Sequence, residues 1–140
     1  MGAHIVFQTE QGNGVHGRDD LQPEIVNGKK YMYTATIRVP ATPRIDPKDS
    51  KSREVGPGVR LAILVHEMIH AVGLDNSEHS KDDVFIKSFQ LMPKGQYVNG
   101  VQLTEDVALL GNGSDPLPPV RIESGTITKL KQAWTGEDTK

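Results

Sequence analysis

The chain has 140 residues, of which 36% are hydrophobic and 24% charged, and its formal net charge is −2. This size suits a single compact domain over residues 1–140, and the balanced charge excludes the broad basic surface of a nucleic-acid-binding protein. No apolar run reaches the roughly 18 residues of a membrane span and no signal peptide is recognisable, so we expect a soluble, cytoplasmic protein without a membrane partner.

Two strands are predicted in the first forty residues. Residues 4–9 contain an apolar centre, and residues 31–39 alternate apolar with polar side chains, which is typical of a strand with one buried face. The Asn-Gly pair at residues 27–28 predicts a tight hairpin turn before the second strand. Residues 11–20 and the proline-rich residues 40–58 are predicted to be loops.

A buried helix is predicted over residues 59–72, which are almost continuously apolar. Gly56-Pro57 before this run and Gly73 after it match the expected ends of a helix. A helix that is apolar on nearly all sides must lie inside the protein, so we expect it to be the central helix.

The rest of the chain predicts shorter elements. A helix is expected to start at Ser80, with Phe85 and Phe89 on one face, and a second hairpin is expected to turn at residues 99–100. Residues 104–110 are predicted to be a short helix. A final amphipathic helix is predicted from apolar residues at three- and four-residue steps, namely Ile127, Leu130 and Trp134. The expected fold class is α+β, with a twisted, mostly antiparallel sheet packed on the central helix.

The strongest functional signal is the run His66-Glu67-Met68-Ile69-His70 in the central helix. Residues four apart lie one turn apart, so both imidazoles can bind one metal ion, and Glu67 lies beside them as a candidate general base. The chain has no Cys, and neutral imidazole suits zinc, which is therefore the expected ion. Burying these polar groups without a metal is costly, which favours the metal interpretation over a chance match.

A third ligand is expected after the helix. The segment containing Gly73, Asn76 and His79 resembles the extended zinc signature of metzincin metallopeptidases, most closely the matrixin branch. In that family a glycine three residues after the second His turns the chain, and a third His three residues further on reaches the metal. Gly73 matches, but Asn76 stands at the position of the third His. The resemblance implies a three-residue insertion and His79 as the third ligand, with five alternatives left open: Asp75, Glu78, Asp82, Asp83 and Glu105.

The resemblance extends over residues 58–95 and implies two further features. Matrixins place a methionine in a tight turn beneath the metal, and Leu91-Met92-Pro93 partly matches that pattern, with proline one position early. Metzincins also pair an extended peptide substrate with the edge strand of a twisted sheet. Residues 31–39 are the candidate for that strand.

The function expected from these residues is that of a zinc-dependent peptidase acting on a peptide or protein substrate. His66, His70 and His79 would bind zinc, and Glu67 would take a proton from the metal-activated water. Two alternatives stay open, namely a binding module in which zinc has only a structural role and a metal-dependent hydrolase of non-peptide amides.

Overall fold

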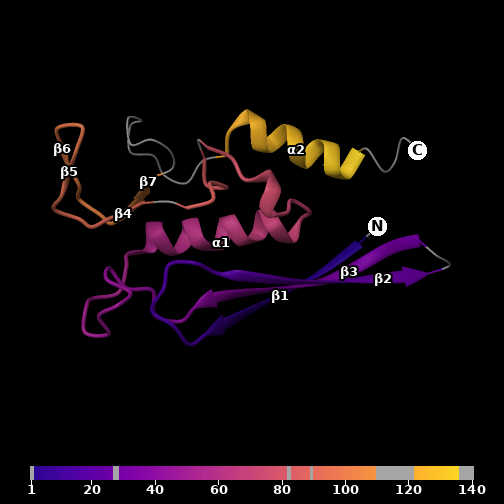
Figure 1. The fold of residues 1–140 in the computed structure, drawn as a ribbon, viewed down its shortest axis with the longest axis horizontal. Helices are drawn as coiled ribbons and strands as arrows, with labels where there is room; N and C mark the ends of the chain where they lie inside the picture. The colour runs from indigo at the N-terminus through magenta and orange to yellow at the C-terminus, as the bar shows by residue number, and fades with distance from the viewer. Residues whose placement is uncertain (1, 27–28, 82, 89, 110–121, 136–140) are drawn as a thin grey trace.

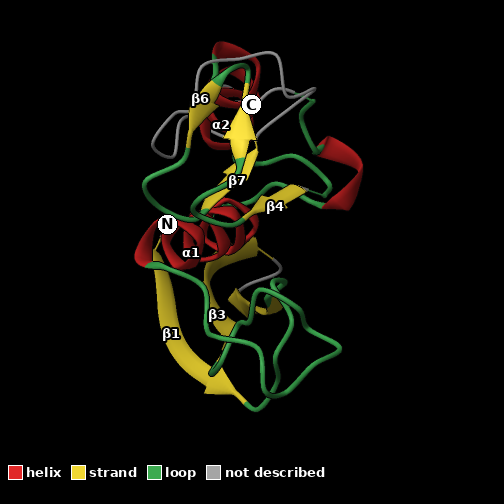
Figure 2. Cartoon of the chain, turned by 90° about the vertical axis from the view of Figure 1, so that its left-hand side faces the viewer, coloured by secondary structure: helices red, strands yellow, loops and turns green. Residues whose placement is uncertain are grey.

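The computed structural model describes residues 2–26, 29–81, 83–88, 90–109 and 122–135. The long helix α1 (Pro57–Ala71) lies in the middle of the molecule (Figure 1). A three-stranded sheet lies on one side of α1, while α2 (Ser124–Thr135) and four short strands lie on its other side (Figure 2). The α+β fold class, the central helix and the C-terminal helix are thereby confirmed.

The sheet contains β1 (Gly2–Glu10), β2 (Arg18–Val26) and β3 (Lys29–Pro40) in the order β1-β3-β2. Because β3 is parallel to β1 and antiparallel to β2, the sheet is mixed rather than mostly antiparallel. Strands are present where the sequence predicted them, at residues 4–9 and 31–39. β2 and β3 form the predicted hairpin, and its turn at residues 27–28 lies outside the described residues.

Two expectations about the sheet are wrong. β2 begins at Arg18, inside the predicted loop of residues 11–20, and β3 is the central strand rather than an edge. The start of β2 is polar and lacks apolar alternation. Ion pairs join its Arg18 to Glu10 of β1 and its Asp20 to Arg38 of β3. β3 has one face that is buried throughout its centre, at Ala35 and Ile37, so it can take the middle of the sheet.

Helix α1 is buried on two sides, which explains its nearly continuous apolar sequence. Its sheet side packs Ala71 and Leu64 against Ala35 and Ile37 of β3. Its opposite side joins the main core, which contains Val55, Val59, Ala62, Ile63, Ile69, Leu74, Val84, Phe85 and Ala108. Pro57 opens the first turn, and Gly73 ends the helix with φ of 127°, a left-handed conformation that favours glycine.

A buried carboxylate, Asp106, holds the start of α1 to the C-terminal half. Its two oxygens accept hydrogen bonds from the Arg53 guanidinium at 2.7 and 2.5 Å, from the Gly56 N–H at 2.8 Å and from the Lys94 N–H at 2.9 Å. These donors, with Arg53 first, lower the pKa of Asp106 to about 2. The ionised carboxylate is therefore part of the folded structure at neutral pH.

The C-terminal half differs from prediction in two segments. No helix begins at Ser80. The chain instead bends so that Ser80 pairs with Ile86, and the buried Asp83 accepts hydrogen bonds from the Ser80 hydroxyl and the N–H groups of Phe85 and Glu123. Phe89 lies outside the described residues. Within residues 104–110, β7 (Val107–Leu109) forms in place of the predicted helix, because β4 (Gln90–Met92) supplies an antiparallel partner.

The second predicted hairpin is confirmed. It joins β5 (Tyr97–Val98) to β6 (Val101–Gln102), with positive φ at both turn residues, 52° at Asn99 and 79° at Gly100. Neither described helix is both long and apolar enough to cross a membrane.

Candidate metal centre

Three imidazoles converge on one side of α1. His66 and His70 lie one turn apart on the helix, and the chain that follows Gly73 returns through a short 3-10 helix, η1 (Asn76–Glu78), to bring His79 beside them. One ring nitrogen from each lies within 4.8 Å of the other two, an arrangement that could hold a metal ion. Three imidazole donors suit borderline ions such as zinc and do not suit ions that require carboxylate-rich or thiolate sites.

The spacing of the closest pair fits a tetrahedral ion. The Nε2 atoms of His66 and His79 are 3.3 Å apart. Two nitrogens bound at about 2.0–2.1 Å to a tetrahedral zinc stand roughly 3.3–3.4 Å from each other. No large rearrangement of these two side chains is needed to bring an ion between them.

Backbone carbonyls orient the two helical imidazoles. The Nδ1 atom of His66 lies 2.9 Å from the Val84 carbonyl oxygen, and that of His70 lies 2.7 Å from the Leu74 carbonyl oxygen. A carbonyl can only accept, so each Nδ1 carries the proton and donates, which leaves Nε2 free with its lone pair toward the centre of the triad. The sequence contains no local signal for these two contacts, because both acceptors lie beyond the motif.

Burial keeps His66 and His79 in the form that binds metals. Burial, with smaller contributions from the neighbouring imidazoles, lowers the pKa of His66 to about 4. Burial also lowers the pKa of His79. At neutral pH both rings are therefore uncharged, as a metal ligand must be.

The three residues between Asp75 and His79 form η1, which is a closed turn of its own. The Asp75 carboxylate accepts hydrogen bonds from the Ser77 N–H at 2.9 Å and the Ser77 hydroxyl at 2.6 Å, while the Glu78 carboxylate accepts from the Asp75 N–H at 3.1 Å. This reciprocal capping fixes the path to His79.

The alternatives for the third ligand are not brought into the triad. Asp75 and Glu78 cap η1, and Asp83 accepts hydrogen bonds from the N–H groups of Phe85 and Glu123. Glu105 is exposed and does not join the cluster, and Asp82 lies outside the described residues. Within the described ranges, the three histidines are the only group of three possible ligands found.

An aromatic ring, rather than a methionine, packs against the three imidazoles. The centroid of Phe85 lies 5.1 Å from that of His66, 4.8 Å from that of His70 and 4.7 Å from that of His79. Met92 packs elsewhere, against the small cluster of Val98, Leu103 and Leu109. The sequence showed Phe85 as an apolar residue but gave no reason to place it at this site.

Glu67 projects to the side of the helix that faces the sheet and is 6% exposed. Burial, with a smaller contribution from the neighbouring Asp19 carboxyl, raises the pKa of Glu67 to about 9. Burial likewise raises the pKa of Asp19, whose two oxygens are buried and receive no hydrogen bond from an N–H or hydroxyl of the described residues. When no cation is near, the pair of carboxyls formed by Glu67 and Asp19 therefore favours the protonated over the fully ionised form.

Gly17 allows the chain to pass over Glu67. A Cβ atom at Gly17 would lie 2.7 Å from the Glu67 Cγ and 2.7 Å from the Arg38 carbonyl oxygen. Any side chain here would displace one of them. Neither Gly17 nor Asp19 was identified from the sequence, because the strand that carries Asp19 was predicted to be a loop.

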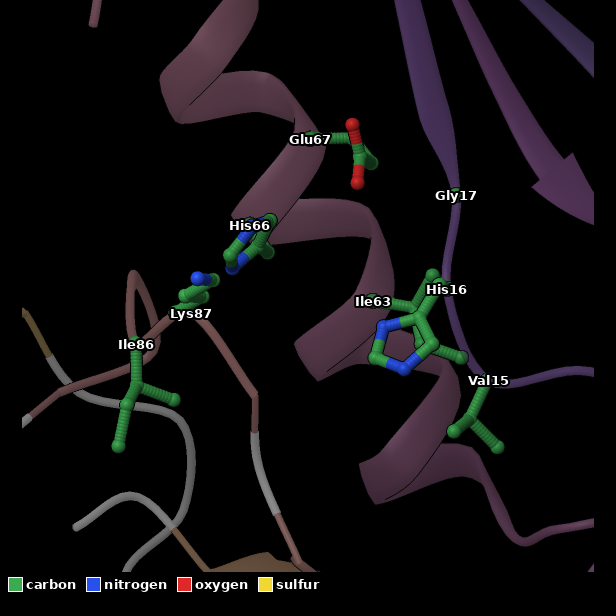
Figure 3. A pocket seen from close by; sticks show the side chains of 8 residues that line it. All are labelled: Val15, His16, Gly17, Ile63, His66, Glu67, Ile86 and Lys87. Atoms are coloured by element: carbon green, nitrogen blue, oxygen red, sulfur yellow. The ribbon is translucent and has the colours of Figure 1, made fainter. Parts of the chain in front are cut away.

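The triad opens into a cavity of about 930 Å³ that includes open solvent. Its walls come from the start of β2, from α1 and from the turn at η1, and its charged lining residues include Arg18, Asp19, Glu67, Asp75 and Lys87. A smaller adjoining space of about 210 Å³ shares His66 and Glu67 with it (Figure 3). A ligand in the large cavity would thus lie directly against the imidazoles.

No protein-family model matches this chain, and no match was found among the curated proteins or the solved structures.

Proposed function

We propose that this chain is a zinc-dependent peptidase of the metzincin type, with His66, His70 and His79 as metal ligands and Glu67 as general base. The observation that carries the proposal is the combination of three converging imidazoles with an adjacent buried carboxylate and an open cavity beside them. A catalytic zinc site has three protein ligands and one open position.

Zinc bound there would supply an acidified water and a positive charge that favours the ionised form of Glu67. Glu67 accepts the proton of the attacking water on its carboxylate and then returns it to the leaving amine. Asp19, from the neighbouring strand, keeps a second carboxyl against Glu67 and restricts its position. The carbonyls of Val84 and Leu74 hold His66 and His70 in one orientation throughout.

Two features favour catalysis over a purely structural zinc site. A structural site is closed by four protein ligands, whereas the described residues supply three and leave the cavity on the remaining side. Burial of Glu67 is also costly for the fold, because a carboxyl in this position must hold a proton or lose stability. A site whose only role is to stabilise the protein gains nothing from such a group.

The position of β2 favours an extended peptide as substrate. β2, and not β3, is the edge strand on this side of the sheet, and its first residues Arg18 and Asp19 line the large cavity. An edge strand presents unpaired N–H and C=O groups to which an extended chain can hydrogen-bond. A peptide paired there would cross the mouth of the cavity beside Glu67.

Zinc stoichiometry tests the ligand assignment. Purified wild type should bind one zinc ion tightly, and His79→Ala should lose it when measured by elemental mass spectrometry after dialysis. Asp75→Asn, which keeps the cap of η1 but removes the charge, and Glu105→Ala should both retain it. Loss of zinc in Glu105→Ala with retention in His79→Ala would refute the assignment.

Peptide cleavage tests the reaction. Zinc-loaded wild type should cleave members of a proteome-derived peptide mixture, and Glu67→Ala at equal zinc content should not. Cleavage by the alanine variant at the wild-type rate would exclude Glu67 as the base. A zinc-loaded wild type that cleaves no peptide would instead support a binding module or a hydrolase of another amide.

A further inference from the structure

The outer edge of β1 lacks the features that usually keep an exposed strand from pairing with another chain. In the part of the chain that the structure describes, β1 has one neighbour, β3, and keeps an unbroken register with it from Gly2 to Glu10. Its nine residues include no proline, lysine or arginine, and residues 5–7 are all apolar. Edge strands are usually protected by such residues, by bulges or by being short. The edge of β1 is therefore open to a further strand.

The opposite edge of the same sheet is protected over its second half. β2 contains Pro23, and a bulge interrupts its pairing with β3 between Glu24 and Ile25. Proline has no N–H to donate, and a bulge twists an edge away from a partner. Only residues 18–22 of β2 keep a regular edge, and the first two of them border the metal cavity. A whole strand from a second copy of this chain can thus be added to the sheet at β1, and not at β2.

Large apolar side chains are exposed beside the open edge of β1. Phe7 pairs in register with Ile37, so its side chain projects from the face of the sheet that α1 covers, yet it is 54% exposed. On α1, Leu61 and Met68 lie about two turns apart on one side of the helix and are 49% and 37% exposed. We call Phe7, Leu61 and Met68 the apolar stripe.

The helix residues of the apolar stripe lie on the side of α1 above β1. Around the helix the order is Glu67, Ala71, Met68, because a step of four residues turns about 40° and a step of one residue about 100° in the same sense. Glu67 lies beside Asp19 of β2, and Ala71 packs on β3. The strands follow in the order β2-β3-β1, so Met68, like Leu61, is on the β1 side, away from the metal cavity (Figure 2).

We propose that this chain forms a two-fold symmetric homodimer in which β1 pairs antiparallel with β1 of a second copy and the two apolar stripes pack together. A two-fold axis perpendicular to the sheet keeps both α1 helices on one face of a sheet with three strands from each copy, and it brings the two Phe7 side chains together near the axis. Because each copy offers one open edge of this length, the assembly closes as a pair. The inference is independent of the proposed peptidase function, since the metal cavity borders β2.

The dimensions fit such a dimer. Strands in a sheet lie about 4.8 Å apart, so helices centred over β3 of each copy would be separated by three spacings, or about 14 Å. Helices in direct contact are about 8–10 Å apart, and the two Phe7 rings have the size to fill the difference. β1 is about 30 Å long, and the strand and helix layers together are about 16 Å deep. The dimer would bury about 1,000 Å² in total, the lower limit of specific interfaces, so we expect a micromolar dissociation constant.

Analytical ultracentrifugation of the full chain tests the dimer. With rising concentration, wild type should pass from the monomer mass of 15.3 kDa to twice that mass. Phe7→Lys and Leu61→Lys should each weaken the dimer at least about tenfold, because each places a charge in an apolar contact. Both positions are exposed in the monomer, so these variants should keep the far-UV circular dichroism of wild type. Tyr97→Lys, at a position 66% exposed on the β5–β6 hairpin, is the matched control and should dimerise like wild type.

Mixing two variants tests the pairing of β1 directly. Phe7→Lys and Phe7→Glu should each be monomeric alone and should form a heterodimer when mixed, because antiparallel pairing of β1 brings the two substituted positions together. Failure to form the heterodimer would overturn this pairing. A wild type that stays monomeric at every concentration, or a dimer that persists unchanged in both Phe7→Lys and Leu61→Lys, would overturn the proposal. The absence of zinc binding or of peptide cleavage would refute only the proposed function, because the dimer is measured without either.

Discussion

Replacing Glu67 by glutamine should stabilise the metal-free protein at neutral pH. Burial raises the pKa of Glu67 from 4.5 to about 9. Between these values the folded protein holds a proton on Glu67 that the unfolded chain has released, so stability falls as pH rises from 4.5 toward 9. Each pH unit in this window costs about 1.4 kcal/mol. Glutamine stays neutral in both states and avoids the cost.

The expected gain for Glu67→Gln follows from that slope. It is near zero at pH 4.5, about 3 kcal/mol at pH 7 and about 5 kcal/mol at pH 8.5. Urea unfolding at several pH values, with a chelator present, measures it directly. His66 also favours unfolding as pH falls from 6.5 toward 4, since burial depresses its pKa, but this contribution is common to both proteins and cancels in the difference.

Glu105→Gln is the matched control, because it makes the same chemical change at an exposed position. We expect it to leave the free energy of unfolding close to that of wild type at every pH. A Glu67→Gln variant that is no more stable than wild type at pH 7, or whose gain does not grow with pH, would show that Glu67 is not held in a costly buried position.

Two further substitutions test the contacts around the centre. Gly17→Ala places a methyl group 2.7 Å from the Arg38 carbonyl oxygen and the Glu67 Cγ. We therefore expect the free energy of unfolding, measured in urea, to fall by about 1–3 kcal/mol, and peptide turnover to fall strongly while zinc is retained. Wild-type turnover in this variant would contradict the packing. Asp106→Asn weakens the contact with Arg53 and should cost about 2 kcal/mol, measured at pH 7. Because the pKa of Asp106 is depressed to about 2, this stabilisation is present above pH 3.8 and disappears as pH falls through 2. If wild type and Asp106→Asn lost stability equally below pH 4, the stabilising role of the ionised Asp106 would be refuted.

Local patterns predicted the parts of the site that lie close together in sequence. The spacing of His66 and His70 fixes their common direction on any helix, and His79 follows once the turn at Gly73 is allowed three extra residues. The contacts from distant parts of the chain could not be predicted in this way. Asp19 reaches Glu67 only because β2 pairs with the edge of β3 that is opposite to β1. No short sequence pattern encodes which strand lies at an edge of the sheet.

In the fold, too, local sequence patterns predicted some elements, while contacts between distant segments decided others. The alternation in β3, the Asn-Gly pair at residues 99–100 and the ends of α1 are local signals, and each predicted its element. Residues 107–109 are a short apolar run that suits a helix or a strand equally well, and pairing with β4 decided the outcome. At Ser80 the serine and aspartate that suggested a helix start instead bond to each other and to the backbone of a bend.

The ring of Phe85 beneath the imidazoles has a consequence for oxidative damage. Peroxide converts methionine to a polar sulfoxide, which would disturb the packing under a metal centre whose floor is a thioether. Phe85 has no sulfur to oxidise, and Met92 lies in a separate cluster. The floor of this centre should keep its shape in oxidising surroundings that would distort a methionine-floored one.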